Sequence, residues 1–481
     1  MTTTRSKTTI IASSITIFGL IGPLIFWLNS YQGQSSRAGS QKNVSYNLPA
    51  RISLGDRVLI TADNNPDKQA GVQFFKAGKF TEAIAKFNDS LQLHRNDPET
   101  WIYLNNATAQ MGGNTLKVAV TVPIGGNLNV AKEILRGVAQ LQYEVNHSRP
   151  IQGKLIQVEI ANDDNDPEVA TQIAKELVKD PKILAVIGHN SSDATFAAAP
   201  IYQQSGVVMI SPTSVANNLT SIGNYIFRTT PSSRVIADTL SQYVVKSLHK
   251  KKIAICTDSK AKASESFKED FIAATFQNGG RVTHTTCDFS SASFSPSDIP
   301  SQAISDGADA LLLLPSVNRI QSAAEVIRAN HGRLTLLGSH TMYTFETLQQ
   351  GQADANNMVM AVSWHPTAMK GNAFSANAKK LWGGSGSWRT AMSYDATKVI
   401  AVALNSGLSR DQLQKALSNS GFLAHGATGD VQFLPSGDRN QLGMLVRVQP
   451  GNESGTGYDF KPILPPSTEA SGKPSTKGES S

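Results

Sequence analysis

Residues 115–450 alternate between two patterns of hydrophobic and polar positions. Short runs of β-branched and aliphatic residues recur, and stretches with helical spacing separate them. Continuous apolar runs are typical of strands buried on both faces, as in parallel sheets covered by helices. The predicted strands are 116–122, 155–160, 183–187, 207–210, 252–256, 310–314, 334–337 and 358–362. The predicted helices between them are 129–146, 167–178, 193–204, 234–249, 264–278, 299–305 and 318–330.

This alternation predicts an α/β fold in which helices cover both faces of parallel sheets. The segment is too long for the usual core of a single sheet, so we expect two α/β lobes. Residues 115–236 and 361–428 are assigned to lobe 1, and residues 237–360 and 429–450 to lobe 2.

The chain begins with a segment of another kind. Residues 8–28 contain no charged side chain, and as a helix they would cross a hydrocarbon core of about 30 Å. Because Arg5 and Lys7 precede this run, we predict that residues 1–30 form a signal anchor with a transmembrane helix. A cleaved signal sequence is the alternative interpretation.

Two further segments are poor in apolar residues. Residues 31–66 are predicted to form a polar stalk with one short strand at 57–60. The C-terminal residues 462–481 contain too little apolar surface to offset the entropy of an ordered chain, so a disordered tail is expected there.

A helical hairpin is predicted at residues 67–112. A first helix carries Val72 and Phe75 and ends at Gly78, and Thr81 is the expected cap of a second helix. The segment resembles a single tetratricopeptide repeat. Such repeats normally bury their faces by stacking on one another. A lone hairpin is therefore expected to dock on the neighbouring domain, or else to bind a partner protein.

Composition and charge exclude several classes of protein. The chain has 481 residues, of which 40% are hydrophobic and 17% charged, with a net charge of +7. These values do not fit a polytopic membrane protein or a highly charged disordered chain. The basic residues form no dense stripe, so no nucleic-acid partner is predicted.

The sequence contains no recognisable catalytic or metal-binding motif. We therefore predict no enzyme activity, no catalytic residues, no metal and no cofactor. The acidic residues Asp163, Asp164 and Asp166 are interpreted as a turn and a helix cap. Two cysteines are too few for a disulfide scaffold. Cys256 and Cys287 are interpreted as buried free thiols, and a disulfide between them is the alternative.

Two strand ends carry groups suited to an anion. Ser191 and Ser192 follow the strand 183–187 and precede a helix, where free N–H groups and hydroxyls would meet a carboxylate. Thr213, Ser214 and Val215 follow the next strand. Ligands of open α/β sheets bind beyond the carboxyl ends of strands. Both segments are candidates for ligand binding, although a serine at such a turn is also an ordinary helix cap.

Between about residues 116 and 449 the sequence resembles the type I periplasmic solute-binding proteins of the branched-chain amino-acid importers. The matching segments are 163–170, 186–195, 208–220, 393–404 and 426–433. This resemblance implies two Rossmann-like lobes that are joined by three crossings and close on a small molecule. It implies binding without chemistry on the ligand.

The resemblance also transfers site residues one by one. The family's carboxylate-binding serine corresponds to Ser192, and the residue that binds the ligand through its backbone corresponds to Thr213. Val215 replaces a threonine of the amino-acid binders, and Ala263 lies nearest to their aromatic-glycine pair. His340 stands where they have the glutamate that binds the ammonium group. The resemblance thus implies that the carboxylate half of an amino-acid site is present and the ammonium half is altered. Either the ligand is not an α-amino acid, or another group binds its ammonium.

Together these features predict a membrane-tethered protein on the extracytoplasmic (periplasmic) face. It would capture a small polar ligand, such as an amino acid or a related amide or carboxylate, and deliver it to the permease of an ABC importer. The alternative is a ligand-binding sensor or scaffold that signals through the helical hairpin.

Overall fold

The computed structural model describes residues 47–368, 373–384 and 386–463. The predicted membrane helix at 8–28 and most of the predicted tail lie outside these ranges, as does the predicted stalk up to residue 46. None of the described helices has the length and apolar character that crossing a membrane requires.

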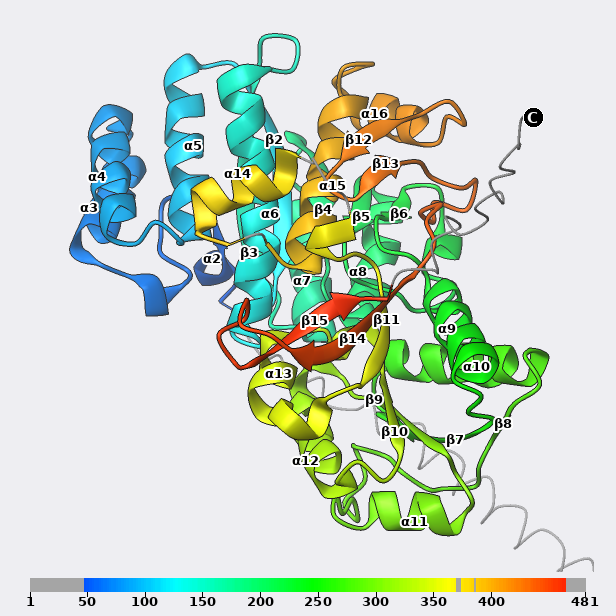
Figure 1. The fold of residues 1–481 in the computed structure, drawn as a ribbon. Helices are drawn as coiled ribbons and strands as arrows, with labels where there is room; N and C mark the ends of the chain where they lie inside the picture. The colour runs from blue at the N-terminus through cyan, green and yellow to red at the C-terminus, as the bar shows by residue number, and fades with distance from the viewer. Residues whose placement is uncertain (1–46, 369–372, 385, 464–481) are drawn as a thin grey trace, which may run out of the picture. The chain divides into compact units, whose positions relative to one another are not determined.

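The first sheet has six strands in the order β1-β3-β2-β4-β5-β6, and only the β1–β3 pair is antiparallel. Its strands are β1 (Ile52–Ser53), β2 (Thr115–Val122), β3 (Leu155–Asn162), β4 (Ile183–Ile187), β5 (Val208–Ser211) and β6 (Ile226–Arg228). The helices of this lobe are α6 (Leu128–Ser148), α7 (Pro167–Leu177), α8 (Ser192–Gln204), α14 (Ala373–Trp382), α15 (Trp388–Ala403) and α16 (Arg410–Leu417) (Figure 1). A two-stranded hairpin, β12 (Ala424–Gly426) and β13 (Gly429–Val431), follows α16.

The second sheet has seven strands in the order β15-β14-β11-β10-β9-β7-β8. They are β7 (Lys252–Thr257), β8 (Arg281–Val282), β9 (Ala310–Leu314), β10 (Thr335–Gly338), β11 (Val359–Val362), β14 (Met444–Pro450) and β15 (Tyr458–Pro462). Strands β7 to β11 are parallel, and β14 and β15 add antiparallel at one edge. The helices are α9 (Ser233–Gln242, continued by a π-turn at Tyr243–Ser247), α10 (Lys262–Gln277), α11 (Ile299–Ser305), α12 (Ile320–Asn330) and α13 (Phe345–Gly351).

All eight predicted strands are present, with bounds that differ by at most two residues. Helix starts follow the local sequence, because short polar side chains accept the free N–H groups of the first turn. Asn127 caps α6, Asp166 caps α7 ahead of Pro167, and Ser409 forms a capping box with Gln412 at α16.

Both sheets change strand order at a comparable place. The first strand of each parallel sheet lies between the second and third, so β2 is flanked by β3 and β4, and β7 by β8 and β9. Loops that leave two such strands in opposite directions open a crevice at their carboxyl ends. Each lobe therefore offers one crevice.

The chain passes between the two sheets three times, in the segments 229–232, 363–366 and 432–443. The predicted two-lobed α/β fold with three crossings is confirmed. Some boundaries differ from the prediction. All of α9 and β11 belongs with the second sheet, and the segment after residue 428 stays with lobe 1, because β13 pairs with β12 and Phe433 packs in the core of lobe 1. The second sheet also continues past residue 450, into β15.

Three α-helices lie between β1 and β2: α3 (Pro66–Lys76), α4 (Phe80–Leu93) and α5 (Pro98–Gly112). The predicted hairpin is present as α3 and α4, but Thr81 is not its cap, since α4 begins at Phe80. The hairpin is followed by α5, which has a regular helix start with Asp97 as its cap and Pro98 in its first turn. The resemblance to a tetratricopeptide repeat stays a prediction.

These helices form one core with lobe 1. Phe75, Phe87 and Tyr103 belong to the same buried cluster as the strands of the first sheet, and Figure 1 shows α3, α4 and α5 arranged in sequence beside α6. Asn106 on α5 attaches this unit to β3, because its side chain both donates to the carbonyl of Val158 (2.8 Å) and accepts from the N–H of that residue (2.9 Å). The hairpin thus docks on the neighbouring domain, as one of its two interpretations expected.

The predicted stalk is folded from Leu48 onward. A short helix, α2 (Leu48–Arg51), leads into β1, which pairs with β3 at the edge of the first sheet. The strand expected at 57–60 is therefore wrong. That segment instead lies on the helical unit, where the N–H of Leu59 donates to the carboxylate of Glu99 (2.6 Å).

A buried cluster of charges holds the helical unit together, and it yields the first prediction. The ammonium of Lys68, with no exposed surface, lies 2.7 Å from carboxylate oxygens of both Asp97 and Glu99. Lys68→Ala would leave two buried carboxylates without a cation, so we expect the free energy of unfolding to fall by about 3–5 kcal/mol. Chemical denaturation measures this loss.

Lys86→Ala is the matched control. Its ammonium also contacts two carboxylates, those of Asp67 and Asp89, but on the surface. Exposed ion pairs contribute little, so this variant should unfold almost like the wild type. Equal losses in the two variants would contradict the structural role assigned to Lys68.

Candidate ligand-binding pocket

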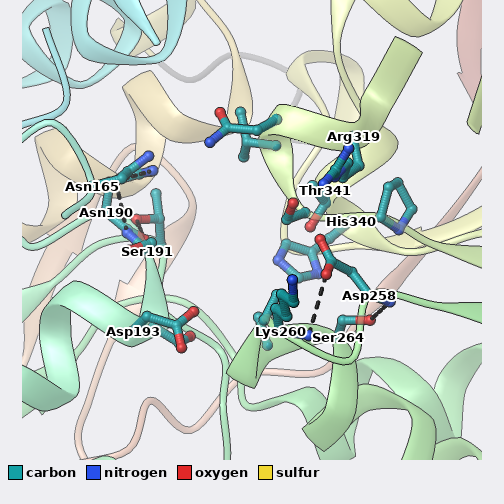
Figure 2. Close-up of a pocket in the computed structure, with 18 of the residues that line it drawn as sticks. Asn165, Asn190, Ser191, Asp193, Asp258, Lys260, Ser264, Arg319, His340 and Thr341 are labelled. Atoms are coloured by element: carbon teal, nitrogen blue, oxygen red, sulfur yellow. Dashed lines mark hydrogen bonds between the residues drawn. The ribbon is translucent and has the colours of Figure 1, made fainter. Parts of the chain in front are cut away.

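A cavity of about 600 Å³ lies between the carboxyl ends of the two parallel sheets. Figure 2 shows residues of lobe 1, among them Asn165, Asn190 and Ser191, facing residues of lobe 2 such as Arg319 and His340 across it. The lining comes from the loops after β3, β4, β5, β7, β8, β9 and β10 and from the start of α15. Among them are the loops after β4 and β7, which lie beside the changes of strand order in the two sheets.

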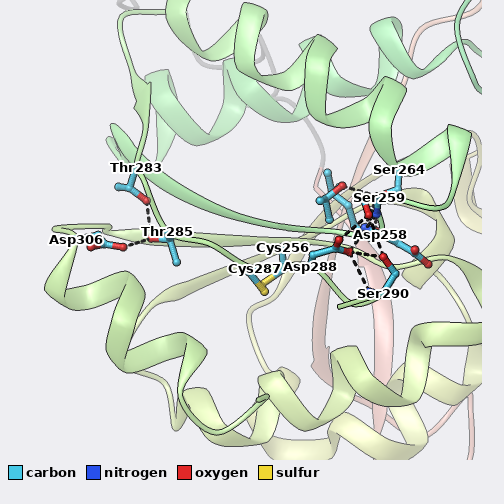
Figure 3. Close-up of a disulfide and its surroundings, with 12 residues drawn as sticks. Cys256, Asp258, Ser259, Ser264, Thr283, Thr285, Cys287, Asp288, Ser290 and Asp306 are labelled. Carbon is cyan, nitrogen blue, oxygen red and sulfur yellow. Dashed lines mark hydrogen bonds between the residues drawn. A yellow bond between two sulfur atoms is a disulfide. The ribbon is translucent and has the colours of Figure 1, made fainter. Parts of the chain in front are cut away.

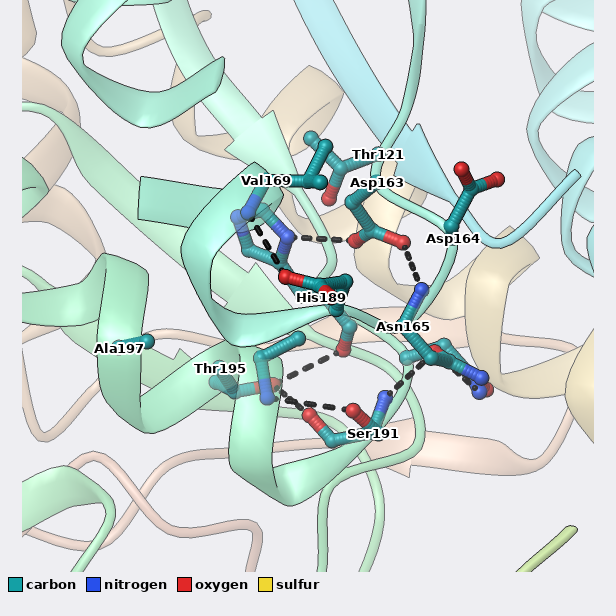
Figure 4. A network of polar contacts seen from close by, with 12 residues as sticks. Thr121, Asp163, Asp164, Asn165, Val169, His189, Ser191, Thr195 and Ala197 are labelled. Atoms are coloured by element: carbon teal, nitrogen blue, oxygen red, sulfur yellow. Dashed lines mark hydrogen bonds and ion pairs between the residues drawn. The ribbon is translucent and has the colours of Figure 1, made fainter. Parts of the chain in front are cut away.

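The side chain of Asn165, in the loop after β3, holds the loop after β4 in place. The side-chain oxygen of Asn165 accepts from the N–H of Ser191 (3.2 Å) and from the amide of Asn190 (3.1 Å). Ser191 in turn caps α8, because its hydroxyl accepts from the N–H of Ala194 (3.2 Å). Figure 4 shows these contacts under the start of the helix. Ser192 opens α8, so its N–H has no acceptor within the helix.

The buried side chains of Asp163 and His189 also fix the loop after β4. Nδ1 of His189 lies 2.6 Å from a carboxylate oxygen of Asp163, and Nε2 lies 3.2 Å from the hydroxyl of Tyr202 (Figure 4). Asp163 and His189 have no exposed surface. Asp166 caps α7, so the acidic loop is a turn and a cap, as predicted. No group of potential metal ligands was found in the part of the chain that the structure describes.

The segment after β5 contributes less than expected. Thr213 lines the pocket, and its hydroxyl donates to the carbonyl of Asn190 (2.9 Å). Ser214 does not line the pocket; its hydroxyl is buried 2.5 Å from that of Thr195. Val215 is fully buried in the core of lobe 2, beside Ile236. The structure therefore places Ser191, Ser192 and Thr213 in the pocket wall but not Ser214 or Val215.

The loop after β7 forms the opposite wall. Asp258, Lys260, Ala263 and Ser264 all line the pocket. The hydroxyl of Ser264 accepts from the N–H of Asp258 (2.8 Å) and donates to the carbonyl of Leu314 (2.7 Å), which joins this loop to the end of β9. Ala263 thus lies in the wall, where the resemblance expected it.

Cys256 and Cys287 form a disulfide just behind this wall (Figure 3). The expectation of free thiols is therefore wrong. The sequence did not show whether the two cysteines meet. In the structure, the N–H of Thr257 donates to the carbonyl of Cys287, which brings the two segments of the chain together. Next to the disulfide, burial acts to raise the pKa of Asp288, but hydrogen bonds from Ser259 and Ser290 outweigh it and hold that pKa at about 2.

His340 lies in the pocket beside the start of α15. Its ring is 5.6 Å from that of Trp388, and the guanidinium of Arg389 lies 4.5 Å above the same indole. Burial, reinforced by Arg389, lowers the pKa of His340 to about 3, so the ring is neutral at physiological pH. Arg389 is itself paired with Glu133 on α6 (3.1 Å).

The two lobes touch across the pocket. The carboxylate of Asp193 at the start of α8 accepts from the N–H of Lys262 at the start of α10 (3.3 Å). Burial raises the pKa of Asp193, and the N–H of Lys262 opposes this shift. The amide of Asn217, which does not line the pocket, donates to Asp270 on α10 (2.8 Å). These contacts join the start of α8 and the segment after β5 in lobe 1 to α10 in lobe 2.

Sequence reasoning did not name the remaining polar, charged and aromatic residues of the lining. Asn165, Asn190 and Asp193 lie in the matching segments 163–170 and 186–195, whereas the others come from segments without a motif; these are Asp258, Lys260, Arg319, Trp388 and Arg389. Their position after predicted strands or at the start of a helix was the available signal. Three cations and two carboxylates among them give the pocket a slight positive balance.

The fold and this pocket define a two-lobed binding protein. The chain belongs to the periplasmic binding protein family, which matches residues 115–455. A Leu/Ile/Val-binding protein of Citrobacter freundii is 34% identical over 146 residues, or 30% of this chain and 39% of that protein. An amino acid binding protein of Pseudomonas aeruginosa is 30% identical over 135 residues, or 28% of this chain and 36% of that protein. The chain thus matches well under half the length of these curated relatives.

Solved structures share the fold over a longer range. A leucine binding protein from Thermotoga maritima covers 73% of this chain and 99% of its own, with a TM-score of 0.64 at 20% identity. A solute binding protein of R. palustris in complex with 4-hydroxybenzoate covers 73% and 96%, with a TM-score of 0.64 at 15% identity. At these identities the likeness establishes the fold alone.

Removal of the disulfide tests how the wall after β7 is held. The double variant Cys256→Ser, Cys287→Ser is expected to lose about 2–4 kcal/mol of stability, because its unfolded chain is no longer cross-linked. Urea denaturation of the variant against the oxidised wild type measures this. An unchanged midpoint and slope would contradict a stabilising disulfide.

The neutral state of His340 predicts a pH dependence of stability. Its pKa is about 3 in the folded protein and about 6.5 in an unfolded chain. As the pH falls from about 6.5 to about 3, the unfolded state gains a proton that the folded state does not, so the wild type loses stability relative to His340→Gln. Above that range the difference should be constant. Thermal unfolding across pH measures it, with the exposed His284→Gln as a control that should show no such trend.

Proposed function

We propose that this protein is an extracytoplasmic solute-binding protein. It captures a small carboxylate-bearing solute, such as an amino acid or a related amide or acid, and delivers it to an ABC importer. The single observation that carries this proposal is the pocket of about 600 Å³ between the strand ends of two lobes, with the first turn of α8 in its wall.

The carboxylate of the solute is assigned to the start of α8. The N–H of Ser192 and the positive end of the helix dipole favour an anion there. Ser192 lines the pocket, and its hydroxyl accepts from the N–H of Ala216 (3.4 Å). The lobe contacts from Asp193 to Lys262 and from Asn217 to Asp270 support closure around the solute. A ligand stabilises the closed arrangement only through its greater affinity for that state.

Relatives support an amino-acid-like solute. The similar protein of Citrobacter freundii is named a Leu/Ile/Val-binding protein, and that of Pseudomonas aeruginosa an amino acid binding protein. We further propose that residues 8–28 tether the protein to the membrane, because that stretch is apolar and follows two cations.

A second candidate function is ligand sensing through the helical unit. A groove of about 790 Å³ runs between α4, α5, α6 and α14, with Trp101 and Tyr143 in its wall, and could accept a partner protein. Arg95→Glu and Lys380→Glu at its rim should abolish capture of a purified candidate partner without changing solute affinity. Unchanged capture would remove this function.

Titration calorimetry and thermal shift with amino acids, amides and small carboxylic acids test the main proposal. A true solute at 100 times its Kd should stabilise the protein by about 2.7 kcal/mol. Ser192→Ala should weaken binding by about 1–3 kcal/mol, because a hydrogen bond to a charged carboxylate is lost. The matched control Ser221→Ala alters an exposed serine of the same lobe and should bind like the wild type. Failure of every compound to bind would sink the proposal.

A further inference from the structure

The two ring nitrogens of His340 have different surroundings. Nδ1 is buried and has no hydrogen-bond partner among the described residues. Nε2 is not buried in this way, and no hydrogen bond to it is found in the described part of the chain. Figure 2 shows the ring directed into the pocket. Nε2 is therefore the nitrogen that a bound solute meets.

The buried nitrogen decides where the proton resides. A neutral imidazole has one N–H and one lone pair. Buried N–H groups without an acceptor are rarer in proteins than buried acceptors without a donor. The favoured tautomer therefore keeps the lone pair on Nδ1 and the proton on Nε2. Because burial and Arg389 keep the ring neutral, with a pKa of about 3, Nε2–H offers the pocket one uncharged donor.

The neighbours of His340 at this end of the pocket are also donors or cations. Trp388 is 2% exposed, and its Nε1–H, which can only donate, has no partner among the described residues. Arg389, whose guanidinium pairs with Glu133 on its other side (3.1 Å), lies 4.5 Å above the indole. Each of the two carboxylates of the lining accepts one backbone N–H, Asp193 that of Lys262 and Asp258 that of Lys260, so part of its accepting capacity is already used.

We propose, resting on the proposed function, that the second polar group of the solute is an oxygen that accepts a hydrogen bond from Nε2–H of His340. The solute is then an acid whose other polar group is a carbonyl or a second carboxylate, and the protein discriminates against α-amino acids.

An ammonium group would be penalised in two ways at this position. An ammonium can hydrogen-bond to Nε2 only if that nitrogen carries its lone pair. The proton of His340 would then have to reside on Nδ1, where it would be buried without an acceptor. The ammonium would also lie near the guanidinium of Arg389. A carbonyl or carboxylate oxygen has neither cost, and the cations Arg319 and Lys260 in the lobe 2 wall favour negative charge.

Matched pairs of acids that differ in one group test this selection. Calorimetry at pH 7 would compare leucine with its 2-oxo acid analogue, and glutamate with 2-oxoglutarate and glutarate. We expect the wild type to bind the compounds of at least one of these two sets. Within that set, the acid without an ammonium should bind at least about tenfold more tightly than the amino acid. His340→Glu places a carboxylate at the same position and should reverse the preference within that set.

Two further variants keep the test decisive. His340→Gln is neutral and can both donate and accept, so it should fold where a buried glutamate fails and should reduce the discrimination to near equality. His284→Glu makes the same change of charge on an exposed residue of lobe 2 and should leave the preference intact.

The outcomes separate this inference from the proposed function. Tighter binding of the amino acid than of its oxo analogue by the wild type would overturn the role given to His340 and leave solute binding standing. A preference that survives in His340→Gln would overturn it as well. Absence of binding by every acid and amino acid would refute both.

Discussion

The direction of the parallel strands is the constraint on which the site depends. In each sheet the carboxyl ends of the strands open toward the space between the lobes, so loops that are far apart in sequence line one pocket. The loop after β4 and the loop after β7 occupy corresponding places in the two sheets, each beside the change of strand order. The pocket is thus a consequence of two similar sheets whose strand ends face each other, and the side chains on those ends determine what it binds.

Much of the polar chemistry near the pocket positions loops rather than meeting a solute. Asp163 and His189 are buried beneath the loop after β4, and Asn165 holds its N–H groups in place. On the other side, the disulfide and Asp288 hold the segment that carries Asp258 and Ser264. Such support matters because a binding protein gains affinity when its donors are already oriented before the solute arrives. Asp163, Asn165, His189 and Asp288 therefore support the loops of the pocket.

The sequence predicted what depends on local pattern and missed what depends on tertiary contact. Long apolar runs located all eight strands, since a strand buried on both faces tolerates few polar residues. Short edge strands such as β1 carry no such run, and β13 stays with lobe 1 through pairing that a boundary drawn from sequence did not anticipate. In the site, Ser192 was predicted from its place between a strand and a helix and His340 through a resemblance, whereas Trp388 and Arg389 reach the pocket from the start of a distant helix. Val215 was misplaced because a residue next to a ligand loop can equally face the core.

The helical unit connects physically to the pocket through a short series of packed elements. The hairpin contacts α5, α5 contacts α6, and α6 contacts α15 over much of its length. Glu133 on α6 pairs with Arg389 at the start of α15, and that arginine lies over the indole that contacts His340. A hairpin that cannot stack on further repeats buries its face here, on the lobe that also binds the solute. Helix α6 contacts both α5 of the helical unit and α15 of the pocket. Any shift of α15 on solute binding must therefore be accommodated by α6.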